Sequence, residues 1–229
     1  MNTDYQISFI DSGPLYLPAG KVVCVGRNYA AHAEELENVI PDEPVLFIKS
    51  TTALTDMNEP FSIPGNHGEC HYETEIAVLV GERLTRCSEQ QAVQAISGIG
   101  IALDLTLRDL QNQLKASSLP WAKAKAFDHS CPISSFVATT ANMDFADLEF
   151  QLLLNDEKVQ QANTSEMIWG IPQLLAYIST FFTLLPGDIV LTGTPAGVGP
   201  LHAGDRIVAE IIGLLKVETS VADTDLLIG

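Results

Sequence analysis

The stretch from His71 to Gly81 constrains this chain most, because two glutamates two residues apart lead into an unbroken run of strand-forming apolar residues. Side chains alternate across a β-strand, so Glu73 and Glu75 are predicted to share one face, with Cα atoms roughly 6–7 Å apart. Carboxylates this close repel each other, and a hard divalent cation would relieve the repulsion. An isolated pair is more often a solvated strand face, so the metal interpretation depends on neighbouring features.

Composition bounds the class of protein. The chain has 229 residues, 46% of them hydrophobic, with no repeat or low-complexity linker. We therefore expect one domain over residues 1–229, with 1–20 as an N-terminal lead-in. Twelve Lys and Arg residues against 29 Asp and Glu give a net charge of −17. This charge argues against nucleic acid or a membrane surface as a partner.

The N-terminal residues lack the basic and apolar regions of a signal peptide, and the longest apolar stretch, 173–185, is too short to span a bilayer. The four cysteines are scattered without a Cys-x-x-Cys pair. A chain of this size does not need disulfides, so reduced thiols are expected. These features predict a soluble, cytoplasmic protein.

Periodicity and turn residues predict many strands and few helices. Strands are expected at 21–26, 44–49, 73–80, 99–105, 148–154, 189–192 and 207–212. Helices are expected at 29–37, 88–96, 106–115 and 172–182. Asn28 is a candidate cap for the first helix, and Ser88 with Gln91 forms a capping box for the second. Strand and helix do not alternate regularly, so the predicted class is a β-rich α+β fold.

A histidine and a glutamate on the first predicted helix have the spacing of a catalytic dyad. His32 and Glu35 are three residues apart and therefore share one helix face. A carboxylate bonded to one ring nitrogen raises the basicity of the other, so such a pair can deprotonate a water near neutral pH. The alternative is an exposed helix pair worth a few tenths of a kcal/mol.

A second group follows the strand at 99–105. Asp104, Arg108 and Gln111 have i, i+4, i+7 spacing across the predicted junction of strand and helix, so all three can face one cavity. The alternative is a capped helix with a surface ion pair. Asp104 ends an otherwise apolar strand, where a carboxylate without a cation is costly to desolvate. Together with Glu73 and Glu75, Asp104 would make three carboxylate ligands, and such a set favours Mg²⁺ or Mn²⁺ over Zn²⁺.

Two other patterns carry weaker signals. His67, Cys70 and His71 lack the second pair that a zinc cluster needs. The glycine-rich stretch 191–199 could hold a carboxylate through its amides and hydroxyls, but it matches neither a phosphate-binding loop nor a dinucleotide fingerprint.

Five of the twelve cationic residues fall within the segments that carry candidate catalytic or binding residues. This is expected if a small anionic ligand needs a local positive pocket. They are Arg27, Lys49, Arg108, Lys123 and Lys125, of which Lys123 is explained equally well as a chance surface lysine and is left out of the catalytic set.

Several motifs occur together in a familiar order. They are Gly26-Arg27-Asn28-Tyr29 with His32 and Glu35, Glu73-Thr74-Glu75, Leu103-Asp104-Leu105-Thr106 with Arg108 and Gln111, Trp121-Ala122-Lys123-Ala124-Lys125-Ala126-Phe127, and Leu191-Thr192-Gly193-Thr194-Pro195. From Lys21 onward the chain resembles the fumarylacetoacetate hydrolase family. The resemblance is greatest to its small acylpyruvate hydrolase and oxaloacetate decarboxylase branch, which lacks the long N-terminal domain of fumarylacetoacetase.

The resemblance implies a mixed β-sandwich roll with a few peripheral helices, assembled as a homodimer. It implies Mg²⁺, or Mn²⁺, held by Glu73, Glu75 and Asp104. It also implies catalytic roles for His32, Glu35 and Lys125. Substrate contacts are implied at Arg27, Lys49, Arg108, Gln111 and Thr194.

The activity expected from such a site is metal-dependent cleavage of acylpyruvates to pyruvate and a carboxylic acid. Water activated by the dyad would attack the distal carbonyl of a small anionic 2-oxo acid. Decarboxylation of oxaloacetate is the first alternative, because loss of CO₂ generates the same enolate. Keto–enol tautomerisation or isomerisation of 2-oxo acids is a further alternative. A catalytically silent metal-binding protein with the same fold is the least favoured interpretation.

Overall fold

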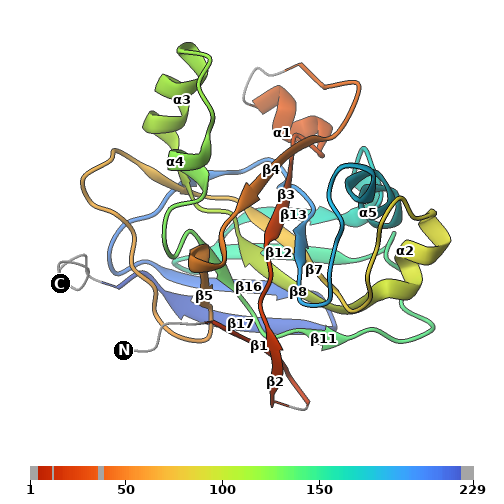
Figure 1. Ribbon diagram of the computed structural model, residues 1–229. Coiled ribbons are helices and arrows are strands. Elements are labelled where there is room, and N and C mark those ends of the chain that lie inside the picture. The colour runs from red at the N-terminus through yellow and green to blue at the C-terminus, as the bar shows by residue number, and fades with distance from the viewer. Residues whose placement is uncertain (1–4, 12, 36–38, 223–229) are drawn as a thin grey trace.

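The computed structural model describes residues 5–11, 13–35 and 39–222 (Figure 1). Its strands are β1 (Gln6–Phe9), β2 (Gly13–Pro18), β3 (Val22–Gly26), β4 (Val45–Lys49), β5 (Leu54–Asp56), β6 (Cys70–Tyr72), β7 (Thr74–Val80), β8 (Ile96–Leu103), β9 (Thr106–Leu107), β10 (Cys131–Ile133), β11 (Val137–Ala138), β12 (Glu149–Leu154), β13 (Glu157–Asn163), β14 (Ile189–Leu191), β15 (Gly199–Pro200), β16 (Arg206–Ile211) and β17 (Leu215–Ser220). Its α-helices are α1 (Ala30–Glu35), α2 (Glu89–Ala95), α3 (Arg108–Ala116), α4 (Ala122–Lys125) and α5 (Ile171–Phe181), and two short 3₁₀ turns are η1 (Thr51–Ala53) and η2 (Thr164–Glu166).

The largest sheet is mixed and has the order β4-β3-β14-β7-β8-β10-β5, with β11 pairing to β8. Its central strand β7 is buried along its whole length. Ile76, Val78 and Val80 face one hydrophobic core cluster, whereas Ala77 and Leu79 face another. Because both faces of this strand are covered, it reads as a continuous apolar run rather than an alternating pattern.

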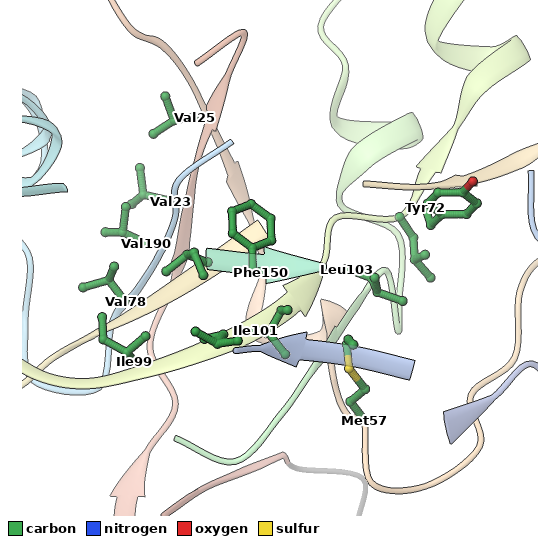
Figure 2. Close-up of a cluster of buried hydrophobic side chains, with 14 of the residues drawn as sticks. Val23, Val25, Met57, Tyr72, Val78, Ile99, Ile101, Leu103, Phe150 and Val190 are labelled. Carbon is green, nitrogen blue, oxygen red and sulfur yellow. The ribbon is translucent and has the colours of Figure 1, made fainter. Parts of the chain in front are cut away.

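A second sheet, β13-β12-β16-β17, lies over one face of the first. Phe150 of β12 is fully buried in the cluster that contains Val78 and Ile101 of the main sheet, and Figure 2 shows these side chains together. The two sheets therefore enclose one core. This arrangement confirms the predicted β-rich roll.

The elements that carry the polar motifs gather at one end of the main sheet. The small sheet β15-β6-β9 joins the chain before β7 to the chain after β8. Helices α1, α3 and α4 stand together at the top of the view in Figure 1. The buried sheet thus forms a rigid base beneath them.

Asn28 corrects a detail of the sequence analysis, because its side chain does not serve as the expected helix cap. It is fully buried, and its Nδ2 donates hydrogen bonds to the carbonyls of Trp169 and Thr192 at 3.1 and 2.8 Å. Its Oδ1 accepts a hydrogen bond from the Trp169 N–H at 2.9 Å. The side chain therefore ties the turn before α1 to two distant segments. Residues 36 and 37 of the predicted helix lie outside the described residues.

Other element boundaries follow from pairing. The Ser88–Gln91 capping box is confirmed, but β8 begins directly after α2 because residues from Ile96 onward pair with β7. Likewise, the helix predicted from Thr106 begins at Arg108, since Thr106 and Leu107 pair with β6. In each case hydrogen bonding between strands overrides the local helical pattern.

Across the described ranges, every helix is too short or too polar to cross a membrane. All four cysteines are free, as expected for reduced thiols. The assignment of residues 1–229 to one domain stays a prediction.

We expect Asn28→Ala to lower the free energy of unfolding by about 2–4 kcal/mol, because three backbone groups lose their hydrogen-bond partner. Chemical denaturation measures this change. The control is Asn112→Ala at an exposed position of α3, which should shift stability by less than about 0.5 kcal/mol. Equal stabilities for the two variants would contradict the bridging role of Asn28.

Candidate active site

Three carboxylates converge where β7 and β8 meet. Glu73, Glu75 and Asp104 each offer an oxygen, and these oxygens lie within 4.8 Å of one another. The residues are only 6%, 2% and 1% exposed. Strand pairing brings them together: Thr74 is opposite Leu103, and the Asp104 N–H donates to the Glu73 carbonyl at 2.8 Å. The sheet register therefore creates the acidic cluster predicted from the sequence.

Three cations contact two of these acids. Lys125 Nζ lies 2.7 Å from Glu73 Oε2 and 2.6 Å from Asp104 Oδ2. Arg108 Nη2 lies 2.5 Å from Glu73 Oε1. Lys49 Nζ lies 2.8 Å from Asp104 Oδ1, although Oδ1 accepts no hydrogen bond from the described residues. Charges buried at this depth are tolerated only when they are paired in this way.

The acids differ in their electrostatic surroundings. Burial would raise the pKa of Glu73, but Lys125 and Arg108 outweigh it and hold that pKa well below its ordinary value. For Glu75, burial and then the Asp104 carboxylate raise the pKa well above its ordinary value. No Lys or Arg of the described residues forms an ion pair with Glu75, whose Oε2 accepts the Gly193 N–H at 2.6 Å. Glu75 is therefore the carboxylate that lacks a cation.

The donor set fits a hard divalent cation. All three side chains offer oxygen, Glu75 lacks a cationic partner, and Asp104 Oδ1 has an unused lone pair. Mg²⁺ and Mn²⁺ prefer such ligands.

His32 and Glu35 are in contact, as their spacing predicts. His32 Nδ1 lies 3.3 Å from Glu35 Oε2, and residue His32 is 5% exposed. Burial lowers the pKa of His32, although the carboxylates of Glu73 and Glu35 oppose this effect. The imidazole is therefore neutral near pH 7. Glu35 Oε1 also accepts the Gly197 N–H at 2.9 Å, which ties α1 to the glycine-rich stretch.

Two positions in the glycine-rich stretch require glycine. Gly193 and Gly197 have φ angles of +98° and +96°, in the left-handed region. A Cβ on Gly193 would lie 2.7 Å from Asn28 Cβ, and one on Gly197 would lie 2.1 Å from the Val159 carbonyl oxygen. These close approaches aim the backbone N–H groups at Glu75 and Glu35.

A pocket collects most of the predicted site residues. They are the three acids with Arg27, His32, Arg108, Gln111, Lys125 and Thr194. The cavity volume is about 40 Å³, room for a few water molecules. Arg108 Nη1 donates to Gln111 Oε1 at 2.8 Å, which agrees with their predicted common face.

Lys49 is placed differently from the other predicted substrate contacts. It is fully buried and does not line this pocket. Its ammonium donates to the carbonyls of Lys125 and Ser130 as well as pairing with Asp104. Substrate contact by Lys49 stays a prediction, and its surroundings favour support of Asp104 from behind.

Three residues around the pocket were missed in the sequence analysis. Gln160 of β13 donates to Thr194 Oγ1 at 2.9 Å and accepts the Thr74 N–H at 3.1 Å, and a glutamine in a polar strand carries no local signal of this role. Lys115 and Trp121 line the pocket directly. Lys115 continues the Arg108–Gln111 helix face, so its spacing could have indicated it.

The family model described as "Fumarylacetoacetate (FAA) hydrolase C-terminal" matches residues 21–222. The chain therefore belongs to the fumarylacetoacetate hydrolase family, as the motifs predicted.

Relatives within this family are enzymes by name. Oxaloacetate tautomerase YcgM of Escherichia coli K12 is 50% identical over 197 residues, which cover 86% of this chain and 90% of that protein. Human mitochondrial oxaloacetate tautomerase FAHD1 is 42% identical over 196 residues, covering 86% and 89% of the two chains. These names favour the predicted alternative over the acylpyruvate hydrolase interpretation.

Solved structures share the fold. A fumarylacetoacetate hydrolase family protein from Yersinia pestis CO92 is 48% identical with a TM-score of 0.92, covering 95% of this chain and 100% of that one. Fumarylpyruvate hydrolase from Pseudomonas aeruginosa, in complex with Mn²⁺ and pyruvate, is 32% identical with a TM-score of 0.90, covering 97% of each chain.

We expect Glu75→Gln to weaken Mn²⁺ binding by at least roughly 10-fold, because it removes the carboxylate that lacks a cation. In EDTA the variant should unfold at the same temperature as the unsubstituted protein or higher, since a buried carboxyl group without a cationic partner is replaced by a neutral amide. In Mn²⁺ the unsubstituted protein should gain more stability than the variant.

Calorimetric titration and thermal unfolding measure both effects. Glu82→Gln, at an exposed position, is the charge-matched control and should behave like the unsubstituted protein. Equal Mn²⁺ affinity in all three proteins would exclude Glu75 from the metal site.

Proposed function

We propose that this protein is a divalent-metal-dependent enzyme that interconverts the keto and enol forms of oxaloacetate. The observation that carries the proposal is a buried His32 that contacts Glu35 through Nδ1 and lines the same pocket as three convergent carboxylates. The names of relatives 42–50% identical to this chain support oxaloacetate as the substrate. We therefore favour tautomerisation over acylpyruvate cleavage, which the sequence alone favours.

The carboxylates of Glu73, Glu75 and Asp104 would hold the metal. A divalent cation bound there would supply Lewis-acid polarisation of the 2-oxo group, which acidifies the protons on C3. In this structure burial lowers the pKa of Lys125, but the carboxylates of Asp104 and Glu73 outweigh burial and raise it. Lys125 therefore acts as a fixed cation rather than as a base.

His32 is the proton carrier in this scheme. Glu35 occupies Nδ1, which leaves Nε2 as the nitrogen that acts on substrate. His32 accepts a proton from C3 of the keto form, and one proton returns to the 2-oxygen to give the enol. The electron pair of the C3–H bond forms the C2–C3 double bond, and the π pair of the C2–O double bond moves onto the oxygen that is protonated, so the step balances without water or a co-reactant.

Three polar residues are suited to orient the substrate. Arg108 and Gln111 share one face of α3, and Thr194, held by Gln160, lines the same pocket. Guanidinium, amide and hydroxyl donors are the groups that fix carboxylate and keto oxygens in such pockets. Binding through them would present C3 to His32.

Acylpyruvate hydrolysis is the second candidate. It is supported by the 32% identical fumarylpyruvate hydrolase, whose structure contains Mn²⁺ and pyruvate. In that reaction His32 would take a proton from water rather than from C3. Decarboxylation of oxaloacetate needs no base, so it would survive the loss of His32.

The remaining expectations belong to this proposal. They are one catalytic unit spanning residues 1–229, assembly as a homodimer, and a cytoplasmic location. A monomer in sedimentation experiments at micromolar concentration would contradict the dimer.

With Mg²⁺ present, we expect the protein to accelerate loss of enol absorbance from oxaloacetate without releasing pyruvate. His32→Ala should reduce this rate by about 100-fold or more, since general acid–base catalysis contributes that much. His202→Ala removes an exposed histidine and should leave the rate unchanged. Faster pyruvate release from acylpyruvates than enol loss from oxaloacetate would favour the hydrolase instead.

The pH profile tests the state of His32. Because burial lowers its pKa, the acidic limb of kcat/KM for tautomerisation should fall below pH 6.5, about the ordinary value for histidine. Above this limb the imidazole is neutral and active. Glu35→Gln removes a carboxylate that opposes the shift, so the limb should move to still lower pH. A limb well above pH 7 would contradict a neutral base at His32.

A further inference from the structure

Cations are concentrated at one pocket of an otherwise acidic chain. The chain has twelve Lys and Arg residues and a net charge of −17, yet four of these cations line the pocket: Arg27, Arg108, Lys115 and Lys125. Arg108 and Lys125 pair with the metal-site acids. Among the described residues, Arg27 and Lys115 form no ion pair with an acid. Two cations are therefore available to a ligand.

Lys115 is positioned by an aromatic ring rather than by a carboxylate. It lies on α3 two helical turns after Arg108, so both face the pocket. Its Nζ lies 5.3 Å from the centre of the Trp121 ring, and Trp121 packs edge-on against Phe47 with ring centres 6.2 Å apart. A cation–π contact of this kind orients an ammonium while leaving its hydrogens free to donate.

Arg27 and Lys115 act on each other electrostatically. Partial burial is the largest of the effects that lower the pKa of Lys115. The charges of Arg108 and Arg27 lower this pKa further. Arg27 is half-buried at a left-handed turn, with φ +59°, directly after β3. Two cations that line one pocket without an ion-paired acid repel, and an anionic group between them would relieve that repulsion.

The charge balance around the three carboxylates also favours an anionic ligand. Its three carboxylates face three contacting cations, Lys49, Arg108 and Lys125. A bound dication would therefore leave the pocket positive, and Arg27 and Lys115 add to the excess. A dianionic ligand offsets this charge better than a monoanion does.

We infer that Lys115 and Arg27 form a second carboxylate subsite, which binds the far carboxylate of a four-carbon dicarboxylic 2-oxo acid. The subsite makes the pocket prefer such substrates over 2-oxo acids with a single carboxylate. This inference rests on the proposed function, because it assigns the specificity of the same site.

Unreactive ligands separate binding at the subsite from turnover. Malate and lactate share the 2-hydroxy acid end and differ in the second carboxylate. In calorimetric titrations with Mn²⁺ present, the unsubstituted protein should bind malate more tightly than lactate. Lys115→Gln should weaken malate binding by about 10-fold or more, as expected for a hydrogen bond to a charged group, and leave lactate within about twofold.

Two further variants guard against trivial explanations. Lys115→Arg keeps the charge and should retain most of the preference for malate. Lys123→Gln removes an equal charge from an exposed position on α4 and should bind both ligands like the unsubstituted protein. In turnover of oxaloacetate, Lys115→Gln should raise KM by about 10-fold with kcat within a few-fold, because the effect is on binding of the charged group.

The outcomes distinguish the two proposals. If the unsubstituted protein does not tautomerise oxaloacetate but Lys115→Gln selectively loses malate, the proposed function fails and the subsite stands. If tautomerisation is present but Lys115→Gln changes malate and lactate equally, or changes neither, the subsite is overturned. Failure of the unsubstituted protein to distinguish malate from lactate would also overturn it.

Discussion

The structure depends on a balance of buried charge at the end of an apolar sheet. Pairing of β7 with β8 buries Glu73, Glu75 and Asp104 together, and carboxylates at that depth require compensating cations. Lys125 and Arg108 supply them from α4 and α3. The helices that close over the site are therefore fixed to the sheet by the same charges that prepare it for a metal. The same ion pairs therefore stabilise the fold and form part of the site.

A second set of contacts places the base. The glycine-rich stretch reaches both halves of the site, because Gly193 donates to Glu75 and Gly197 donates to Glu35. Asn28 fixes the turn before α1 against the start of that stretch. His32 is thus held relative to the acids through hydrogen bonds that join the side chains of Asn28, Glu35 and Glu75 to backbone groups of the glycine-rich stretch. This is the kind of support that precise proton transfer requires.

Local patterns predicted the parts of this protein that depend on near neighbours. The apolar run after Glu75 gave a buried strand, and three-residue spacing gave the His32–Glu35 pair. Contacts between distant segments escaped prediction: Gln160 supports Thr194 from another sheet, and strands as short as β10 and β11 exist only through pairing with β5 and β8. Asn28 looked like a helix cap because its use by Trp169 and Thr192 depends on the completed fold. Residue spacing alone left the metal site and the dyad as alternatives to surface pairs, and the family motifs favoured the metal site and the dyad.

The most direct test of the central claim is a crystal structure grown with Mn²⁺, with the anomalous signal used to locate the ion. Glu73, Glu75 and Asp104 form the only group of three or more metal-ligating side chains in residues 5–11, 13–35 and 39–222 whose ligand atoms converge within 4.8 Å. The account predicts one strong peak bounded by these three carboxylates, with Glu75 among the ligands. An empty position between them, or a peak at exposed acids elsewhere, would contradict it.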